Sequence, residues 1–391
     1  MIHFIAKIFQ IVAVLGCISS AIYYLICWWS ADVFVRRRDA GREPDAAAAL
    51  PPISILKPLK GTDPNIYESF RSHCLQDYPE YEIIFGVSGP EDPAVASVEQ
   101  LQREFPELEI RLLVCADILG TNVKVSNLEQ MARQARYEYF LVNDSDIRVD
   151  SDYLRRIIEP LANERIGMVT CLYRGVAAPT LGSRLEALGI STDFCAGVLV
   201  AQLLERGLHF GLGSTLAFRR ADLERIGGFK SLVDFLADDY ELGRRIAGLN
   251  KRVVLSAVVV ETHLPEYELR GFIEHQLRWF RGIRDARRTG YIGLVSTFGI
   301  LWALLAVLAA GAAPWSWAVL GAMLLLRTIV ALVMCRSVLQ DEDTVEQLWL
   351  LPLRDLIAAA VWIASFAGNT VTWRGDRFEL KNGRLIRAAP R

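Results

Sequence analysis

Two long stretches without a charged residue constrain the fold of this chain more than any other feature. They cover residues 8–29 and 289–326, and are 22 and 38 residues long. A membrane-spanning helix needs about 20 apolar residues, so the first stretch predicts one span and the second predicts two, joined by a turn at residues 311–314. A third uncharged stretch, residues 356–373, predicts a further span or a re-entrant segment. We therefore expect an integral, multi-pass membrane protein.

The residues that follow the first stretch indicate on which side of the membrane the rest of the chain lies. Trp28 and Trp29 end the stretch, and arginines occupy positions 36–38. Tryptophans collect at membrane interfaces and basic residues on the cytoplasmic side, which favours an uncleaved anchor over a cleaved signal peptide. The expected segments are an anchor (1–35), a cytoplasmic α/β domain (45–265), an interfacial helix (266–288), two transmembrane helices (289–335), a third hydrophobic segment (348–373) and a basic tail (374–391).

Strand and helix signals alternate between the hydrophobic ends. Apolar runs predict strands at residues 53–57, 82–87, 109–114 and 137–142. The runs between them predict helices at residues 64–75, 93–105 and 122–135. This order predicts an α/β fold with a parallel, doubly wound sheet.

The remaining segments are less regular. Residues 166–172 and 253–260 predict further buried strands, and residues 181–208 predict a helix that is buried or lies on the membrane surface. Residues 40–52, rich in alanine, proline and charge, predict a linker. Asn382-Gly383 predicts the turn of a small hairpin.

The strand predicted at residues 137–142 ends in Asn143-Asp144-Ser145-Asp146. Ligands bind to open α/β folds at the carboxyl ends of the strands. Short acidic side chains at alternate positions can hold a divalent cation, which in turn can hold a diphosphate. Such a triplet also arises by chance or caps a loop. Its place directly after a buried strand favours Asp144 and Asp146 as ligands of Mg²⁺ or Mn²⁺.

Three other segments carry polar residues suited to a nucleotide. Lys60 lies in a basic turn after the first strand, and Asp92 follows the second. Asp92 can bond a base or ribose, or simply cap the helix that starts at Pro93. Lys124 and Asn127 are three residues apart and share a helix face. From that face they can bind phosphate or sugar hydroxyls, or they form a solvated first turn.

A dense acidic patch at residues 234–241 precedes an amphipathic helix, and Asp238 and Asp239 lie within it. The helix dipole keeps a carboxylate in a first turn ionised. An ionised carboxylate suits a general base that takes a proton from a hydroxyl nucleophile. Capping accounts for one of the four acids in this patch, and four are more than a cap needs.

The segment from His275 to Trp279 stands before the second uncharged stretch. Arginines recur at positions 278, 281, 284 and 287, along one broad side of a helix that can lie on anionic headgroups. Arg278 can reach a leaving diphosphate. Basic residues commonly flank membrane spans on the cytoplasmic side, which accounts for the later arginines. This tendency accounts less readily for the Arg278–Trp279 pair.

Cysteine content and net charge point to no other class of site. The seven cysteines occur singly, without zinc or redox spacing, and are expected to be buried, reduced thiols. The formal net charge is −2, and no nucleic-acid partner is expected.

Taken in order, these segments resemble the ceramide glucosyltransferase family, membrane-bound relatives of the inverting family 2 glycosyltransferases. The likeness spans nearly the whole chain. The family's three aspartate motifs match Asp92, Asp144 and Asp239, and its Gln/Arg-x-x-Arg-Trp motif matches residues 275–279. Ile-Leu-Lys-Pro-Leu-Lys-Gly at 55–61 and Asn-x-Lys-x-x-Asn at 122–127 also resemble the family.

This resemblance implies a GT-A fold that faces the cytoplasm, a UDP-sugar donor, a divalent metal, and a membrane lipid alcohol as acceptor. Asp239 would be the base. The donor would be held by Lys60, Asp92, Lys124, Asn127 and Asp144, with Asp144 and Asp146 at the metal. Asp238, His275, Arg278 and Trp279 would serve the diphosphate and the acceptor.

Two departures from the family pattern leave the acceptor open. His275 stands where the family has Gln or Arg, and Asp146 stands where animal members have Gly. Both departures suggest a bacterial protein, which would lie in the inner membrane. Similar bacterial proteins accompany hopanoid synthesis. The expected reaction transfers glucose or N-acetylglucosamine, with inversion, to ceramide or to a hopanoid polyol. The alternatives are a processive polysaccharide synthase, a polyprenyl-phosphate glycosyltransferase, and an inactive nucleotide-sugar-binding scaffold.

Overall fold

The computed structural model describes residues 2–40, 50–373 and 376–387. The described part of the chain divides into two compact units. The sheet unit comprises Ala40–Ala178, Leu204–Pro265 and Gly383–Arg391, and the helical unit comprises Met1–Asp39, Pro179–Leu203 and Glu266–Asn382. Most of the expected linker (41–49) and parts of the expected basic tail (374–375 and 388–391) lie outside the described residues.

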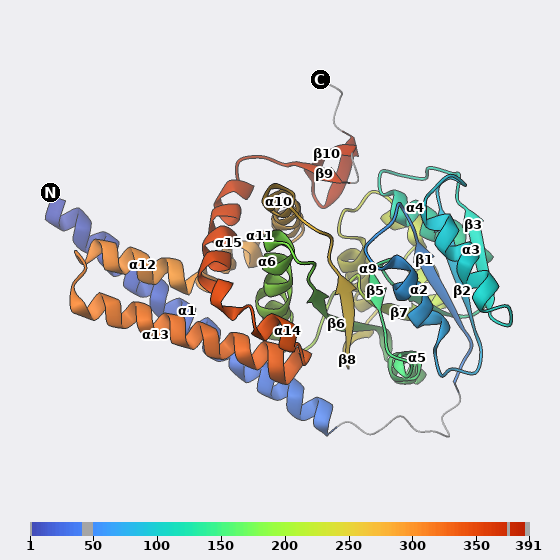
Figure 1. Ribbon diagram of the computed structural model, residues 1–391, viewed down its shortest axis with the longest axis horizontal. Coiled ribbons are helices and arrows are strands. Elements are labelled where there is room, and N and C mark those ends of the chain that lie inside the picture. The colour runs from blue at the N-terminus through green and yellow to red at the C-terminus, as the bar shows by residue number, and fades with distance from the viewer. Residues whose placement is uncertain (1, 41–49, 374–375, 388–391) are drawn as a thin grey trace. The chain divides into compact units, whose positions relative to one another are not determined.

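The sheet unit is built on one mixed sheet with the strand order β3-β2-β1-β4-β7-β6-β8-β5 (Figure 1). The parallel half contains β1 (Ile53–Pro58), β2 (Tyr81–Val87), β3 (Glu109–Val114) and β4 (Tyr139–Val142). The other half contains β5 (Ile147–Arg148), β6 (Ile166–Val176), β7 (Leu216–Arg219) and β8 (Arg252–His263). The first four strands lie where the apolar runs predicted them.

The sheet departs from an all-parallel pattern at its last strand β5, which pairs antiparallel with β8, and at β7. This strand pairs antiparallel with β4 and with β6, whereas β6 and β8 are parallel to each other. The strand β7 is not predicted from the sequence, because four residues beside a glycine-rich segment give too short a signal. The fold is therefore mixed α/β with a largely parallel sheet.

Helices on the sheet supply the rest of the core. They are α2 (Ile66–Cys74), α3 (Ala94–Glu104), α4 (Val123–Gln134), α5 (Tyr153–Ile158), α8 (Arg220–Arg225) and α9 (Asp238–Ala247), with 3-10 turns at Glu159–Ala162 and Phe229–Leu232. Phe70 of α2 and Val98 of α3 are fully buried in one cluster with Ile55 and Phe85. A Cβ at Gly86 would lie 2.3 Å from Sδ of Met131, so the glycine lets α4 approach β2 closely.

The helical unit contains the apolar stretches. Its helices are α1 (Ile2–Asp39), α6 (Leu181–Gly189), α7 (Cys195–Leu204), α10 (Leu269–Ala286), α11 (Arg288–Gly293), α12 (Gly299–Ala309), α13 (Pro314–Leu332), α14 (Glu342–Val345) and α15 (Leu351–Ser365). π-helical turns occur at η2 (Ile190–Phe194) and η5 (Val333–Leu339), and 3-10 turns at Leu294–Thr297 and Leu348–Leu350. Strands β9 (Thr370–Trp373) and β10 (Asp376–Lys381) pair antiparallel. Asn382 and Gly383 have φ values of 53° and 77°, as a two-residue hairpin turn requires. The strand that follows, β11 (Arg384–Arg387), belongs to the sheet unit.

Among the described residues, four helices are long and apolar enough to cross a membrane: Phe4–Asp39, Leu181–Leu204, Pro314–Leu339 and Leu348–Ser365. A fifth candidate is bent by 56° between Arg288–Thr297 and Gly299–Ala309. The bent pair and Pro314–Leu339 occupy the region where two transmembrane helices were predicted. Leu181–Leu204, predicted as a buried or surface helix, also has the length and composition of a span, and 61% of its most apolar stretch is buried in the protein.

Arginine side chains are paired inside this apolar unit. Arg327 of α13 is 3% exposed. Its guanidinium donates to both carboxylate oxygens of Asp355 at 3.0 and 2.9 Å, and to Asp193 at 2.5 Å. Arg354 donates to Gln276 at 2.9 Å. Because an unpaired charge in an apolar environment is costly, this network stabilises α13, α15 and η2 as one packed group.

Removal of one partner tests that network. We expect Arg327→Leu to lower the free energy of unfolding by about 3–5 kcal/mol, because it leaves the carboxylates of Asp355 and Asp193 without their guanidinium. Arg336→Leu is the control, since its ion pair with Glu342 is exposed and contributes about 0–1 kcal/mol. Thermal unfolding in detergent measures both variants. Equal effects of the two substitutions would contradict a stabilising role for the buried pair.

Candidate active site

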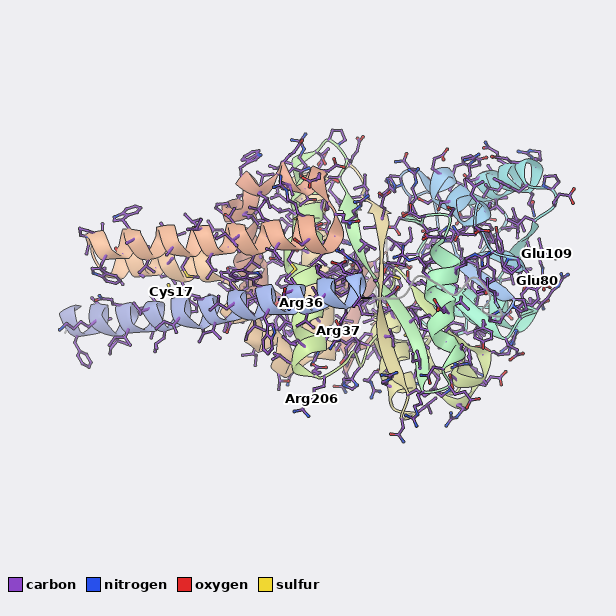
Figure 2. All side chains as sticks on the ribbon, turned by 90° about the horizontal axis from the view of Figure 1, so that it is seen from below. Cys17, Arg36, Arg37, Glu80, Glu109 and Arg206 are labelled. Carbon is purple, nitrogen blue, oxygen red and sulfur yellow. The ribbon has the colours of Figure 1, made fainter. Side chains whose placement is uncertain are left out.

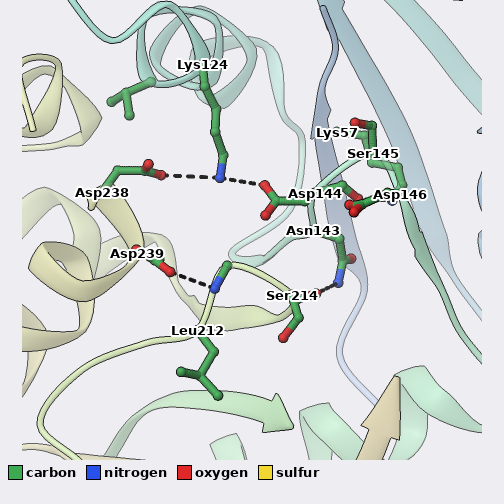
Figure 3. Close-up of polar contacts among 12 residues, drawn as sticks. Lys57, Lys124, Asn143, Asp144, Ser145, Asp146, Leu212, Ser214, Asp238 and Asp239 are labelled. Atoms are coloured by element: carbon green, nitrogen blue, oxygen red, sulfur yellow. Dashed lines mark hydrogen bonds and ion pairs between the residues drawn. The ribbon is translucent and has the colours of Figure 1, made fainter. Parts of the chain in front are cut away.

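The loop after β4 is held by Asn143, which is fully buried. Its Nδ2 donates to the hydroxyl of Tyr153 at 2.9 Å and to the carbonyl of Ser214 at 2.6 Å. The bond to Ser214 ties the Asp144–Asp146 turn to the loop that precedes β7 (Figure 3). The neighbouring strands β4 and β7 thus bring two loops together at one edge of the sheet.

Lys124 bridges two acidic segments that are distant in the sequence. Its Nζ lies 2.6 Å from Oδ1 of Asp144 and 3.5 Å from Oδ2 of Asp238, as Figure 3 shows. Burial alone would lower the pKa of Lys124, but Asp144, Asp238 and Asp239 raise it above its ordinary value. The lysine therefore remains an ammonium ion between the carboxylates.

Asn122 fixes the start of α4, and with it Lys124. Its Oδ1 accepts from the backbone N–H of Val125 at 3.2 Å, as an N-cap does. Its Nδ2 donates to the carbonyl of Phe235 at 2.8 Å and lies 3.4 Å from Oδ1 of Asp238. The N-cap residue of α4 therefore also binds the segment that leads into α9 and its aspartates.

Asp239 and Asp144 approach each other at Gly213. The backbone N–H of Gly213 donates to Oδ2 of Asp239 at 2.8 Å. A Cβ at position 213 would lie 2.9 Å from Oδ2 of Asp144 and 3.3 Å from Oδ2 of Asp239. The other oxygen of Asp239 accepts from the N–H of Tyr240 at 2.7 Å. Burial, and then Asp238, raise the pKa of Asp239 to about 6.

Asp146 has different neighbours. Its Oδ2 accepts from the hydroxyl of Thr262 at 2.5 Å. Burial, and then Asp144, raise the pKa of Asp146 to about 6. Lys57, fully buried at the end of β1, donates to the carbonyl of Asp144 at 3.1 Å. Burial lowers the pKa of Lys57 to about 7. Lys57 and Lys124 thus lie among the carboxylates around this turn.

Lys60 and Asp92 lie in the loops that follow β1 and β2, and Asn127 lies on α4. Asp92 accepts from the N–H of Gly61 at 3.1 and 3.0 Å, and from that of Ala94 at 3.0 Å, so the capping role is present. Asn127 is buried, and its amide bonds Ser88 and the carbonyl of Gly86. Lys60 is exposed. Donor-binding roles for these three residues stay predictions.

The predicted residues of the Arg-Trp motif lie on α10, in the helical unit. His275 contacts Glu186 at 3.2 Å, and its ring lies 5.4 Å from those of Tyr267 and Trp279. Gln276 donates to Glu186 at 2.7 Å. Arg278 is half-buried. Their roles toward diphosphate or acceptor stay predictions.

Arg281 and Arg284 follow on the same helix. Arg281 donates to the carbonyl of Thr370, and Arg284 to the carbonyls of Ser365 and Gly368. These two arginines therefore hold the segment after α15, a role that the predicted contact with headgroups did not anticipate.

The acidic turn can supply part of a metal site. Within the described ranges, no group of three or more His, Cys, Asp or Glu side chains is arranged to hold a metal ion. Mg²⁺ commonly takes only one or two carboxylates from the protein and the rest of its ligands from phosphates and water. The excess of carboxylate over ammonium groups around Asp144 and Asp146 fits such a cation bound together with a diphosphate.

Sequence reasoning gave no individual role to several residues that shape this site, namely Lys57, Asn122, Asn143, Gly213 and Thr262. The first three stand inside segments that the sequence had already singled out. Each acts through a contact to a residue far away in the sequence. One signal was available for Gly213, because Gly-Leu-Gly-Ser-Thr at 211–215 is a flexible segment that opens a buried strand.

The sheet order, with acidic loops at one edge, defines a GT-A type glycosyltransferase fold. A mannosyltransferase from Pyrobaculum calidifontis, PcManGT, solved in complex with GDP-Man and Mn²⁺, shares this fold. The TM-score is 0.55 at 20% identity, over 92% of this chain and 99% of that chain.

The chain belongs to glycosyl transferase family 21, whose sequence model matches residues 12–386. Ceramide glucosyltransferase 1 of Caenorhabditis elegans is 25% identical over 274 residues, which cover 70% of this chain and 58% of that protein. Ceramide glucosyltransferase 3 of the same organism is 26% identical over 235 residues, 60% of this chain and 51% of that protein. The matches span little more than half of these relatives. The resemblance to the ceramide glucosyltransferase family is confirmed.

Proposed function

We propose that this chain transfers a hexose, glucose or N-acetylglucosamine, from a UDP-sugar to a hydroxyl of a membrane lipid, with inversion at the anomeric carbon. The proposal includes a divalent metal, Mg²⁺ or Mn²⁺. The observation that carries it is the approach of the Asp144 and Asp239 carboxylates at Gly213, with the Lys124 ammonium ion beside them.

Asp239 supports the proposal as the general base. Each of its two oxygens accepts a hydrogen bond from a different backbone N–H. The carboxylate is therefore fixed in direction and still has free lone pairs. Its raised pKa makes it a stronger base than an ordinary aspartate, while it is still ionised at neutral pH. In the proposed step, Asp239 takes the proton of the acceptor hydroxyl. The acceptor oxygen bonds to the anomeric carbon as the bond to the diphosphate oxygen breaks on the opposite side.

Asp144 and Asp146 are proposed to hold the cation. When bound, the metal would neutralise the charge that develops on the leaving diphosphate. Lys124 is proposed to bind a phosphate oxygen of the donor, because it already lies against Asp144 and is kept protonated. We also propose that the guanidinium of Arg278 binds the leaving diphosphate.

The membrane helices support a lipid as the acceptor. A water-insoluble alcohol is dissolved in the same bilayer that the helical unit would cross. The relatives are ceramide glucosyltransferases, and we propose a ceramide-type or hopanoid alcohol. Arg36 and Arg37 stand toward the end of α1 that follows its apolar stretch, well past Cys17 (Figure 2). Positive charge at that end favours a cytoplasmic location for the sheet unit.

Removal of the proposed base is the first test. We expect Asp239→Asn to lower kcat by about 10²–10⁴-fold, because the amide cannot take the proton. Asp117→Asn, at an exposed aspartate, serves as the control and should retain activity. The assay supplies purified protein with a panel of UDP-sugars and lipid alcohols, and mass spectrometry identifies the product. Full turnover by Asp239→Asn would exclude this residue as the base.

A methyl group at Gly213 tests the convergence of the two carboxylates. Gly213→Ala places a Cβ 2.9 Å from Asp144 and 3.3 Å from Asp239, so one carboxylate must move. We expect kcat/KM to fall by about 10²-fold. Gly197→Ala is the matched control, because no atom lies within 4 Å of a Cβ there. Unchanged activity of Gly213→Ala would mean that the two carboxylates need not be held this closely.

Metal dependence is tested by chelation. We expect EDTA to abolish transfer and Mn²⁺ or Mg²⁺ to restore it. We also expect Asp146→Asn to raise the cation concentration needed for half-maximal activity by about tenfold or more. Asp117→Asn again provides the control. Transfer that persists in EDTA at the untreated rate would rule out the proposed cation.

A further inference from the structure

The C-terminal strand of the chain contacts the segment that leads into the acidic motif of the sheet unit. The N–H of Leu385 donates to the carbonyl of Asp234 at 2.7 Å, and the N–H of Leu236 donates to the carbonyl of Gly383 at 3.1 Å. Phe235 and Arg384 form an antiparallel bridge. The side chain of Leu385 is 2% exposed. Residues 383–385 thus extend the 234–236 segment as a short ladder.

The 234–236 segment sets where α9 begins. Only Ala237 separates it from Asp238, the first residue of that helix. The carbonyl of Phe235 accepts from Asn122 Nδ2 at 2.8 Å, and the carbonyl of Val233 accepts from Asn122 N–H at 2.6 Å. A shift of this segment would therefore move Asp238 and Asp239 relative to the start of α4.

Thr121 joins the ladder to α4. Its N–H donates to Oδ1 of Asp234 at 3.1 Å. Its hydroxyl lies 3.1 Å from the same oxygen and 3.0 Å from the carbonyl of Leu385. One residue therefore contacts both strands of the ladder, and it stands three positions before Lys124.

The ring of Phe235 packs against two arginine side chains and against Gly383 of this ladder. The ring lies 5.3 Å from the guanidinium of Arg245 and 5.2 Å from that of Arg384. A Cβ at Gly383 would touch the ring at 3.4 Å, so the glycine fits against Phe235. Gly383 also has a positive φ of 77°, which glycine adopts without strain.

We propose that β11, through Thr121 and the 234–236 segment, positions Lys124 against Asp238 and Asp239, so that the C-terminal strand is a working part of the transfer site. The proposal rests on the proposed function. Thr121, Asp234 and Leu385 are positioning residues, because they act on the site through its neighbours. The 3.5 Å contact between Lys124 and Asp238 joins two segments that the ladder holds together.

The test compares three single substitutions. Thr121→Val keeps the shape but removes the hydroxyl, and Thr121→Ser restores it. Thr297→Val is the matched control, because Thr297 also bonds a carbonyl, that of Leu294 at 2.7 Å, but within the helical unit. We expect Thr121→Val to lower kcat by about 10-fold or more and to weaken UDP binding, while the KM for the lipid acceptor stays unchanged. Thr121→Ser and Thr297→Val should behave as the wild type.

A shortened chain and a measurement of hydrogen exchange complete the test. A chain that ends at Lys381 lacks β11, and we expect the same loss of kcat in it, but larger. Hydrogen exchange of residues 233–241 should be faster in both Thr121→Val and the shortened chain. Faster exchange with unchanged kcat and UDP affinity would overturn the proposal, since the contact would then be structural only. Unchanged exchange and unchanged kinetics would overturn it as well.

The two proposals fail in different ways. If the wild-type protein binds UDP but transfers no sugar to any lipid alcohol, the proposed function is wrong. UDP affinity and hydrogen exchange in Thr121→Val still decide whether β11 positions Lys124, because neither measurement depends on transfer.

Discussion

The contact of one partly buried ammonium ion with two carboxylates organises the candidate site. Asp144 and Asp238 come from different loops, and like charges so close together in a partly desolvated place repel strongly. Lys124 lies between them at 2.6 and 3.5 Å. The carboxylates in turn keep the lysine charged despite its burial. This bridge therefore joins the start of α4, the turn after β4 and the start of α9.

The site still carries more negative than positive charge. Burial and neighbouring aspartates raise the pKa values of both Asp146 and Asp239, which means that the folded protein holds these carboxylates at an electrostatic cost. Such unfavourable electrostatics are typical of sites that bind a cation or move a proton. The helical unit shows the opposite case. There Arg327 meets Asp355 and Asp193 in full hydrogen-bonded geometry, as charges in apolar surroundings must.

Local patterns predicted much of the fold. The runs that became β1 to β4 and α2 to α4 have the length and apolar spacing that these elements need, and such spacing is visible in the sequence. The residue types at the site were also visible, since acids directly after a buried strand are unusual. The antiparallel insertion of β7 was not predicted, nor was the use of Arg281 and Arg284 to hold backbone carbonyls. In both cases the partner lies elsewhere in the chain, and a local pattern carries no record of it.

The sequence by itself determined which segments are apolar enough for a membrane, which alternate as strands and helices, and which acids and bases stand at their ends. These properties depend on side chains within a few residues of each other. Only the tertiary structure decided that Asp144 and Asp239 meet at Gly213, that Asn143 ties two loops together, and that Leu385 contacts Thr121 across 264 positions. Such contacts depend on strand order and on close packing, and packing selects partners by shape and distance in space, which the order of residues along the chain does not reveal.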